Sequence, residues 1–395
     1  MKIAVTGMGI ISAIGKTLEE NLYHLKYGVT GITHSEQLST RHKRLLFGEV
    51  KLSNEHLTGL LALPDDNNFS RTAMLGAYAA QQALENAAIK DINAFRTGLI
   101  SASSVSGMDM TEKYLYDFTE SETHRKYISS HHTGNVTHQI ADYIGVQGLV
   151  TTISTACSSS ANAIMMGANL IKTGRLDRVV VGGTGALAKF TVNGFNSLMI
   201  LTDGYNMPFD ANRKGLNLGE GAAYLVLESD MVVKKQGKPV LAYLAGYGNA
   251  NDAYHQTASS ETGEGAFLAM EKALASAGIQ PGKISYVNAH GTATPNNDLS
   301  EARALERIFG NEKPDISSTK PFTGHTLAAA GSIEAIYSIL AMQHQLVFPN
   351  LNFRTPMEEV SVQPQQTLKE KEIEFTLSNS FGLGGNCSTL IFSRK

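Results

Sequence analysis

The chain has 395 residues, of which 42% are hydrophobic and 17% charged, and its formal net charge at pH 7 is -3. This length suits two domains or one duplicated domain, and the weak net charge gives no basic surface for nucleic acid. Two cysteines exclude a disulfide framework, and there is no signal-like apolar start or membrane-spanning run. We therefore expect a cytoplasmic protein that enters no membrane.

Strand and helix patterns alternate along the first hundred residues. They predict strands at residues 2–6 and 97–102, and helices at residues 18–27, capped by Thr17, and 72–88. Such alternation is typical of an α/β fold with buried sheets. The polar segment 106–143 follows neither period, and we interpret it as a cap or a dimer-forming excursion.

A cysteine stands where a strand pattern gives way to a helix pattern. Residues 149–154 are rich in β-branched side chains and predict a buried strand, and the apolar residues from Ala161 to Ile171 have helical spacing. Cys157 therefore lies on the turn that opens a helix. Free backbone N–H groups and the helix dipole favour thiolate there, so Cys157 is a candidate nucleophile.

The chain repeats itself weakly. Three pairs of segments are similar and occur in the same order: residues 4–12 and 243–251, 154–160 and 320–326, and 219–227 and 384–392. This echo predicts two homologous halves, 1–240 with the cysteine and 241–395 with both candidate histidines.

Each half also has one helix pattern that is almost free of charge. Residues 156–171 contain no charged side chain, and residues 326–343 contain only Glu334. Helices that are apolar nearly all round are buried on both sides. We therefore expect a central helical layer between two sheets.

The second half supplies three polar motifs at predicted strand ends. His290 ends an apolar strand, Lys320 and His325 lie in the turn before the second buried helix, and residues 377–386 form a strand followed by a glycine-rich turn. If the halves are related by a pseudo-twofold axis, His325 faces Cys157. A zinc site needs three or four ligands, and neither histidine has another ligand at helical spacing, so we predict no metal.

These motifs together resemble the β-ketoacyl synthases of the thiolase superfamily, closest in outline to synthase II and to type II polyketide ketosynthases. The resemblance covers essentially the whole chain, and its blocks are residues 5–9, 155–157, 209–215, 218–221, 252–257, 288–292, 320–325 and 379–382. It implies a duplicated thiolase-like α/β fold with five layers, αβαβα, and two buried central helices. It implies no cofactor other than the phosphopantetheine of an acyl carrier protein, and a homodimer or a heterodimer with a chain-length-factor-like subunit.

The resemblance also implies a reaction. Cys157 would accept an acyl group from a thioester, with the backbone N–H groups of Cys157 and Phe381 as the oxyanion hole. His290 and His325 would stabilise the enolate formed when malonyl-acyl carrier protein loses carbon dioxide. Attack of the carbanion on the acyl-cysteine would give a β-ketoacyl product, as in fatty-acid elongation.

Two further residues match the family's supporting lysine and glutamate, namely Lys320 and Glu301. Glu301 lies on an amphipathic helix pattern, so a solvated position stays open for it. Thr292 and Thr294 match positions that hydrogen-bond the pantetheine arm, or they cap turns. Phe381 matches the gating phenylalanine that separates the empty from the acylated cysteine. Phe195 and Val105 match positions that line the acyl pocket, or they pack in the core.

The chain departs from the family in its last glycine motif and in its acyl pocket. Leu383 replaces an aromatic residue, Cys387 replaces an asparagine, and Val105 is smaller than usual. These changes leave the substrate open, with a specialised type II polyketide or aryl polyene pathway as the alternative to fatty-acid elongation.

Three other functions are less well supported. A thiolase would use Cys387 as a second catalytic cysteine, but that residue falls inside a predicted core strand. A non-catalytic chain-length-factor subunit would lack the nucleophile. The pair Gly7 and Gly9 after a strand suggests dinucleotide binding, but Ser12 stands where the fingerprint needs a third glycine.

Overall fold

The computed structural model describes residues 2–394, and one mixed sheet dominates it. Ten strands pair in this order: β5 (Val150–Ile153), β4 (Thr97–Ala102), β6 (Arg178–Gly185), β7 (Gly221–Ser229), β1 (Ile3–Ser12), β8 (Ala242–Asn251), β14 (Asn386–Ser393), β13 (Phe375–Phe381), β9 (Ile284–Asn288) and β10 (Asp315–Ser317).

The sheet consists of two halves with the same topology. From the outer edge inward, the strands of the first half are β5, β4, β6, β7 and β1, and those of the second half are β10, β9, β13, β14 and β8. In chain order within its own half, each series is the third, second, fourth, fifth and first strand. In both halves the second strand pairs in parallel with the third and the fourth, and the remaining pairs are antiparallel. The two first strands, β1 and β8, pair antiparallel and join the halves. The predicted duplication of the fold is confirmed.

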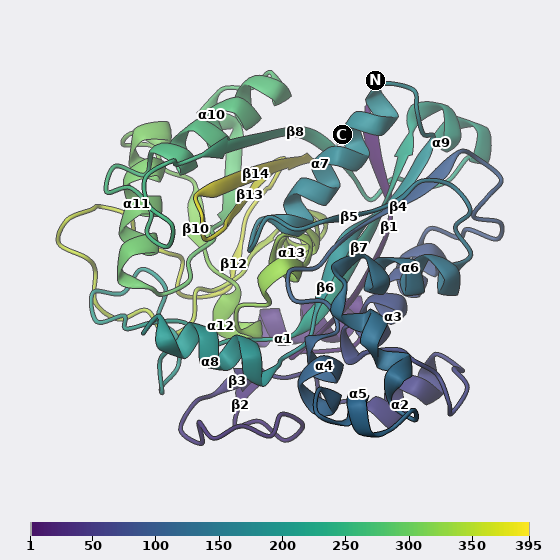
Figure 1. The fold of residues 1–395 in the computed structure, drawn as a ribbon. Helices are drawn as coiled ribbons and strands as arrows, with labels where there is room; N and C mark the ends of the chain where they lie inside the picture. Colours follow the sequence, from purple (N-terminus) through teal and green to yellow (C-terminus); the bar gives the residue numbers. More distant parts are fainter. Residues whose placement is uncertain (1, 395) are drawn as a thin grey trace.

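The two halves of the sheet form two layers of the molecule, and helices form the other three (Figure 1). The central layer holds α7 (Ser159–Lys172) and α13 (Ala330–His344), which contact each other and strands of the surrounding sheet halves. The outer layers hold α3 (Arg71–Asn86) with α6 (Thr133–Ile144), and α10 (Glu264–Ala277) with α11 (Pro295–Phe309). This is the expected five-layer order.

The two central helices differ in burial. Every residue from Ala330 to Met342 is buried in α13, as predicted. In α7 Asn169 is exposed and Asn162 and Met166 are half-buried. This strip lies against the face of β8 that is turned away from α10, where the hydroxyl of Tyr247 donates to the Asn169 side chain.

The glycine pairs of β1 and β8 permit the outer helices to pack closely. A Cβ atom on Gly9 would lie 2.1 Å from the backbone oxygen of Ala79 in α3, and one on Gly248 would lie 2.2 Å from that of Ala269 in α10. The equivalent glycines thus meet equivalent helices. Helix packing explains the Gly-x-Gly pattern, and the dinucleotide interpretation is unnecessary.

The elements predicted near the N-terminus are present, and β1 is longer than expected. The helix α1 (Leu18–Tyr27) begins after Thr17, whose side chain accepts from the N–H of Glu20, and β4 has the predicted bounds. The prediction of a buried strand at residues 149–154 is wrong in its burial. All four residues of β5 are half-buried because β5 is an edge strand.

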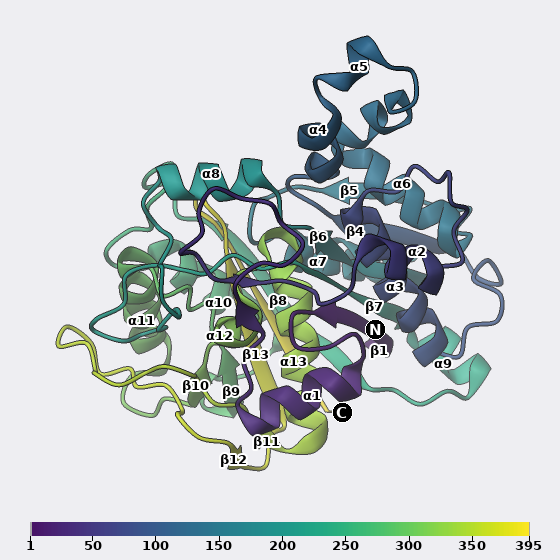
Figure 2. The same ribbon diagram turned by 90° about the horizontal axis from the view of Figure 1, so that it is seen from below.

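In the irregular segment 106–143, α4 (Met108–Tyr114), α5 (Asp117–Glu120) and η1 (Arg125–His131) form a helical lobe, and α4 and α5 project from the sheet (Figure 2). The segment ends in α6, which packs on α3 and on the edge of the sheet. The remaining elements are β2 (Ile32–Thr33), β3 (Phe47–Gly48), α2 (Asn54–Leu60), α8 (Lys189–Ser197), α9 (Asp230–Gln236), η2 (Pro281–Lys283), α12 (Lys320–Thr323), η3 (Leu327–Ala329), β11 (Leu346–Val347) and β12 (Lys369–Glu370). No helix among residues 2–394 has the length and apolarity needed to cross a membrane.

Candidate active site

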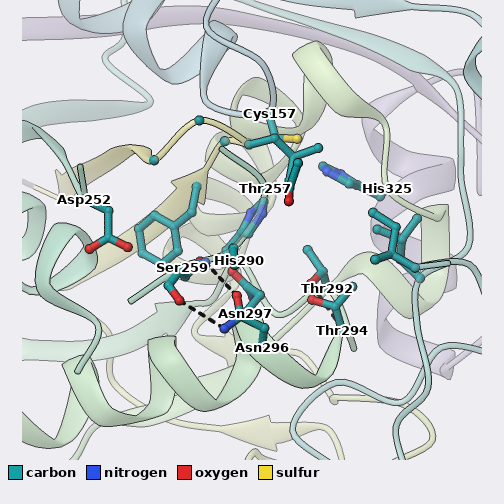
Figure 3. A pocket seen from close by; sticks show the side chains of 18 of the residues that line it. Cys157, Asp252, Thr257, Ser259, His290, Thr292, Thr294, Asn296, Asn297 and His325 are labelled. Carbon is teal, nitrogen blue, oxygen red and sulfur yellow. Dashed lines mark hydrogen bonds between the residues drawn. The ribbon is translucent and has the colours of Figure 1, made fainter. Parts of the chain in front are cut away.

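A cavity of about 310 Å³ collects the chemical groups of both halves. Cys157 enters it from the first half, and His290, His325 and Phe381 enter it from the second. Figure 3 shows the cysteine and the two imidazoles around one space. The structure therefore brings together the three residues that the sequence motifs single out as nucleophile and hydrogen-bond donors.

Cys157 lies on a tight turn just before α7. Ala156 adopts φ 53°, and the hydroxyl of Ser159 donates to the Ala156 oxygen and accepts from the N–H of Thr155. Burial raises the pKa of the Cys157 thiol to about 11, although Lys320 and the N–H of Leu383 act in the opposite direction. The helix terminus therefore does not make a resting thiolate, contrary to expectation, because desolvation is the larger effect.

The two histidines are neutral bases at neutral pH. Their ring centroids lie 5.4 Å apart, edge to face, and both residues are buried. Burial and the nearby Lys320 ammonium lower the pKa of both imidazoles well below the ordinary value of 6.5. A neutral imidazole carries one N–H, so each ring supplies one hydrogen-bond donor without a charge.

Lys320 orients the ring of His290. Its Nζ atom lies 2.5 Å from the backbone oxygen of His290 and 3.3 Å from the Nδ1 atom of the same residue, and it pairs with Glu334. An ammonium group only donates, so Nδ1 accepts and the ring proton resides on Nε2. Lys320 is 1% exposed, so it is not a surface lysine.

The glutamate that pairs with Lys320 is Glu334, which the sequence motifs did not single out as a site residue. Glu301 is fully buried and accepts from the N–H groups of His290 at 2.9 Å and Gly291 at 2.8 Å. It therefore holds the backbone of the histidine loop, and a solvated position is excluded. Burial raises the pKa of each carboxyl to about 7.

The sequence contained a signal for Glu334. It is the one charged residue between Thr326 and Gln343, in a helix pattern with no polar face. A charge with no route to solvent requires a buried partner of opposite charge. Lys320, just before the same helix, is that partner.

Leu383 supplies a further backbone N–H beside the thiol. The N–H of Leu383 lowers the pKa of the Cys157 thiol, and the ring of Phe381 packs 5.5 Å from the ring of His290. Leu383 begins the glycine turn, in which Gly384 and Gly385 have φ values of 90° and 85°. Leu383 is thus a backbone donor at the cysteine that the sequence motifs did not indicate.

The residues expected to bind substrate divide into two groups. Thr292, Thr294 and Phe195 line the cavity, and the hydroxyls of the two threonines lie 2.9 Å apart. Val105 is not among the lining residues. It follows β4, and its backbone oxygen accepts from the N–H of Met108.

One wall of the cavity is polar, and the sequence did not predict its residues as part of the site. It comprises Asp252, Thr257, Ser259, Asn296 and Asn297. Asn296 is tied to Ser259 by two hydrogen bonds of 2.6 and 3.0 Å (Figure 3). The signal was the polar run at 252–257, whose residue types fit a loop but indicate no position relative to Cys157.

Cys387 lines the same cavity from inside β14, as the strand pattern predicts. Burial, Asp252 and Glu301 all raise the pKa of its thiol. A thiol so disfavoured as thiolate is a poor base. Residues 2–394 contain no group of three or more His, Cys, Asp or Glu side chains placed to bind a metal ion.

Family models match most of the chain. A model described as "Beta-ketoacyl synthase, N-terminal domain" matches residues 1–231, and "Beta-ketoacyl synthase, C-terminal domain" matches residues 241–354. The 3-oxoacyl-[acyl-carrier-protein] synthase 2 of Vibrio cholerae is 32% identical over 410 residues, which cover 100% of this chain and 99% of the relative.

Two solved structures have the same fold over their full length. The ishigamide ketosynthase/chain length factor superposes with a TM-score of 0.92 at 26% identity, covering 100% of this chain and 99% of the other. A type II polyketide ketosynthase in complex with its acyl-carrier protein, AntDE:AntF, has a TM-score of 0.88 at 26% identity, covering 99% of each chain.

Proposed function

The chain belongs to the beta-ketoacyl synthase family, and from that premise we propose that it condenses an acyl thioester with malonyl-acyl carrier protein to give β-ketoacyl-acyl carrier protein. The observation that carries the proposal is one buried cysteine beside two neutral imidazoles in one cavity. Two uncharged donors suit an enolate oxygen, whose charge develops only during the reaction.

The first half-reaction loads Cys157. Its sulfur attacks the thioester carbonyl, and the N–H of Leu383 and that of Cys157 stabilise the oxyanion. The carbon–sulfur bond to pantetheine then breaks, and the pantetheine sulfur leaves as a thiol with the proton that Cys157 loses. The acyl group stays on Cys157.

The second half-reaction extends the chain by two carbons. The malonyl carbon–carbon bond breaks, carbon dioxide leaves, and the electron pair moves to the thioester oxygen as an enolate. The Nε2–H of His290 and the imidazole N–H of His325 hold that oxygen. The enolate carbon attacks the acyl-cysteine, the carbon–sulfur bond breaks, and the released Cys157 thiolate takes a proton from water.

Fatty-acid elongation is the pathway we assign, because full-length relatives at 32% identity are named 3-oxoacyl-[acyl-carrier-protein] synthase 2. A second candidate is a specialised type II polyketide or aryl polyene pathway. The likeness to ketosynthases solved with a chain length factor favours it, and so do Leu383 and Cys387, which line the cavity.

Two other functions fit the site poorly. A degradative thiolase needs a second cysteine as a base, and the raised pKa of Cys387 opposes that role. A non-catalytic partner subunit would not retain Cys157, His290 and His325 in one cavity.

We further propose a cytoplasmic homodimer, with a chain-length-factor heterodimer as the alternative, and no cofactor beyond the carrier's phosphopantetheine. The unpaired edge of β5 supports dimerisation. Leu149 and Ile153 bond to β4 through their backbone oxygens, so the N–H groups of the alternate residues Val150 and Thr152 point outward. Unpaired N–H groups at the edge of a sheet can form hydrogen bonds with a strand of a second chain.

Mass spectrometry of the intact protein tests the function. After incubation with acyl-acyl carrier proteins of graded chain length, Cys157 should gain the acyl mass, and addition of malonyl-acyl carrier protein should discharge it. The variant Cys157→Ala should fold and form no β-ketoacyl product. Product formation by that variant would refute the assignment.

A further inference from the structure

The turn that carries Cys157 touches the glycine turn of the other half. A Cβ atom on Gly382 would lie 2.8 Å from the backbone oxygen of Thr155 and 3.3 Å from the nitrogen of Cys157. The N–H of Leu383, the next residue, lowers the pKa of the Cys157 thiol across this contact. The reactivity of the thiol therefore depends on how firmly the two turns are held together.

Asn386 closes the glycine turn. Its backbone oxygen accepts from the N–H of Gly382 at 2.8 Å. Its side-chain oxygen, Oδ1, lies within hydrogen-bonding distance of three donors, which are Ser158 Oγ at 2.7 Å, Asn162 Nδ2 at 2.8 Å and Asn249 Nδ2 at 3.0 Å. One side chain thus connects the glycine turn to residues on both halves.

The first two donors also hold the turn of the nucleophile. Asn162 Nδ2 has two protons, and it donates the other to the hydroxyl of Thr155 at 2.8 Å. Ser158 Oγ lies 2.7 Å from the backbone oxygen of Thr155, so its single proton is shared between that oxygen and Asn386. Thr155 and Ser158 flank Cys157, whose turn includes the left-handed Ala156.

We propose that Asn386 is a positioning residue, which acts through Asn162 and Ser158 to hold the nucleophile turn against the glycine turn and so aligns the N–H of Leu383 with the Cys157 sulfur. This role rests on the proposed function, since it concerns the loading of the same cysteine. An amide fits the position because it accepts several hydrogen bonds without a charge. An aspartate would accept them equally well but would place a negative charge next to the forming thiolate.

The primary test uses Asn386→Leu, which keeps the side-chain size and removes the acceptor. Single-turnover acylation of Cys157 should slow about tenfold or more, with KM for the acyl carrier unchanged, because an alignment is lost rather than a binding contact. The pH profile of Cys157 alkylation by iodoacetamide should move to higher pH, since the N–H of Leu383 no longer stabilises the thiolate. A merely structural role would leave that profile unchanged.

Asn249→Ala is the matched control. It removes a donor from the same oxygen, but Asn249 is exposed and bonds to neither Thr155 nor Ser158. Acylation by this variant should stay within about twofold of the parent protein. An equal loss in both variants would overturn the proposal, and so would unchanged acylation in Asn386→Leu.

A second variant, Asn162→Ala, removes the bridge between Thr155 and Asn386 at a helical position that suits alanine. If Asn386→Leu fails to fold, this variant decides, and acylation at the parent rate would overturn the proposal. Alkylation needs no carrier protein. If the parent protein accepts no acyl group, the proposed function fails, whereas the alkylation profiles still test the role of Asn386.

Discussion

Burial determines the ionisation of the groups around Cys157. It raises the pKa of the thiol to about 11 and lowers those of His290 and His325, so all three are uncharged at neutral pH. A thiolate–imidazolium pair is therefore not preformed. The fixed charge nearby is the Lys320–Glu334 pair, which orients His290 through its Nδ1 atom. On Cys157, His290 and His325 themselves, charge appears only when the substrates react.

One consequence is that chemical modification of the Cys157 thiol should become faster as the pH rises. Alkylation of Cys157 by iodoacetamide should accelerate about tenfold per pH unit between pH 7 and pH 10, because the thiolate fraction grows in that proportion below the pKa of about 11. Stopped-time mass spectrometry measures the rate, and Cys157→Ala gives the background from Cys387. A plateau below pH 9 would contradict a raised pKa.

A second consequence separates the two half-reactions. His290→Ala and His325→Ala should each slow malonyl decarboxylation by about a hundredfold or more, since each removes one donor to the enolate oxygen. Both variants should still form the acyl-enzyme. Release of labelled carbon dioxide and the intact mass of the protein report the two steps independently. Loss of acylation in either variant would mean that the histidine acts in the first step.

At the scale of elements, close packing of strand against helix explains the repeated glycines. Gly9 and Gly248 occupy equivalent places in β1 and β8, and each lies against the backbone of an outer helix. The two similar Gly-x-Gly segments of the sequence thus correspond to the same strand–helix packing contact, which occurs once in each half. Local patterns also predicted α1 and β4 correctly, because their capping and β-branched residues act within a few positions of the chain.

The packing at these glycines predicts a strong effect of a single methyl group. Gly9→Ala and Gly248→Ala should each lower the free energy of unfolding by about 1–3 kcal/mol or more, because the obstacle is backbone and cannot rotate away. Gly59→Ala, in α2 with open space around it, should be neutral or stabilising by up to about 1 kcal/mol. Thermal unfolding of the three variants compares them. Equal melting temperatures would argue against tight packing.

At the scale of the whole molecule, the active site exists only where the two halves meet. Cys157 comes from one half and its partner groups come from the other, and the central helices α7 and α13 contact each other beneath them. The same arrangement leaves β5 as a free edge and part of α7 uncovered, and both are available to a partner chain.

The free edge gives a test of assembly. Thr152→Pro removes an outward N–H group without removing a hydrogen bond to β4, so it should convert the proposed dimer to a monomer. Thr152→Val loses the same hydroxyl contact to Thr137 but keeps the N–H group, and it should remain dimeric. Sedimentation equilibrium distinguishes the two states. A parent protein that is monomeric would refute the dimer itself.

The sequence by itself determined the duplicated α/β fold, the nucleophile turn at Cys157, and the motifs that carry His290, His325 and Lys320. Strand periods, helix patterns and repeated motifs are local in the chain, so they can be recognised without coordinates. Only the tertiary structure decided that Glu334 pairs with Lys320, that Glu301 holds the backbone of the histidine loop, and that the N–H of Leu383 lies beside the thiol. It also decided that burial outweighs the helix dipole at Cys157. These outcomes depend on distances and desolvation between segments far apart in the chain, and no local pattern encodes them.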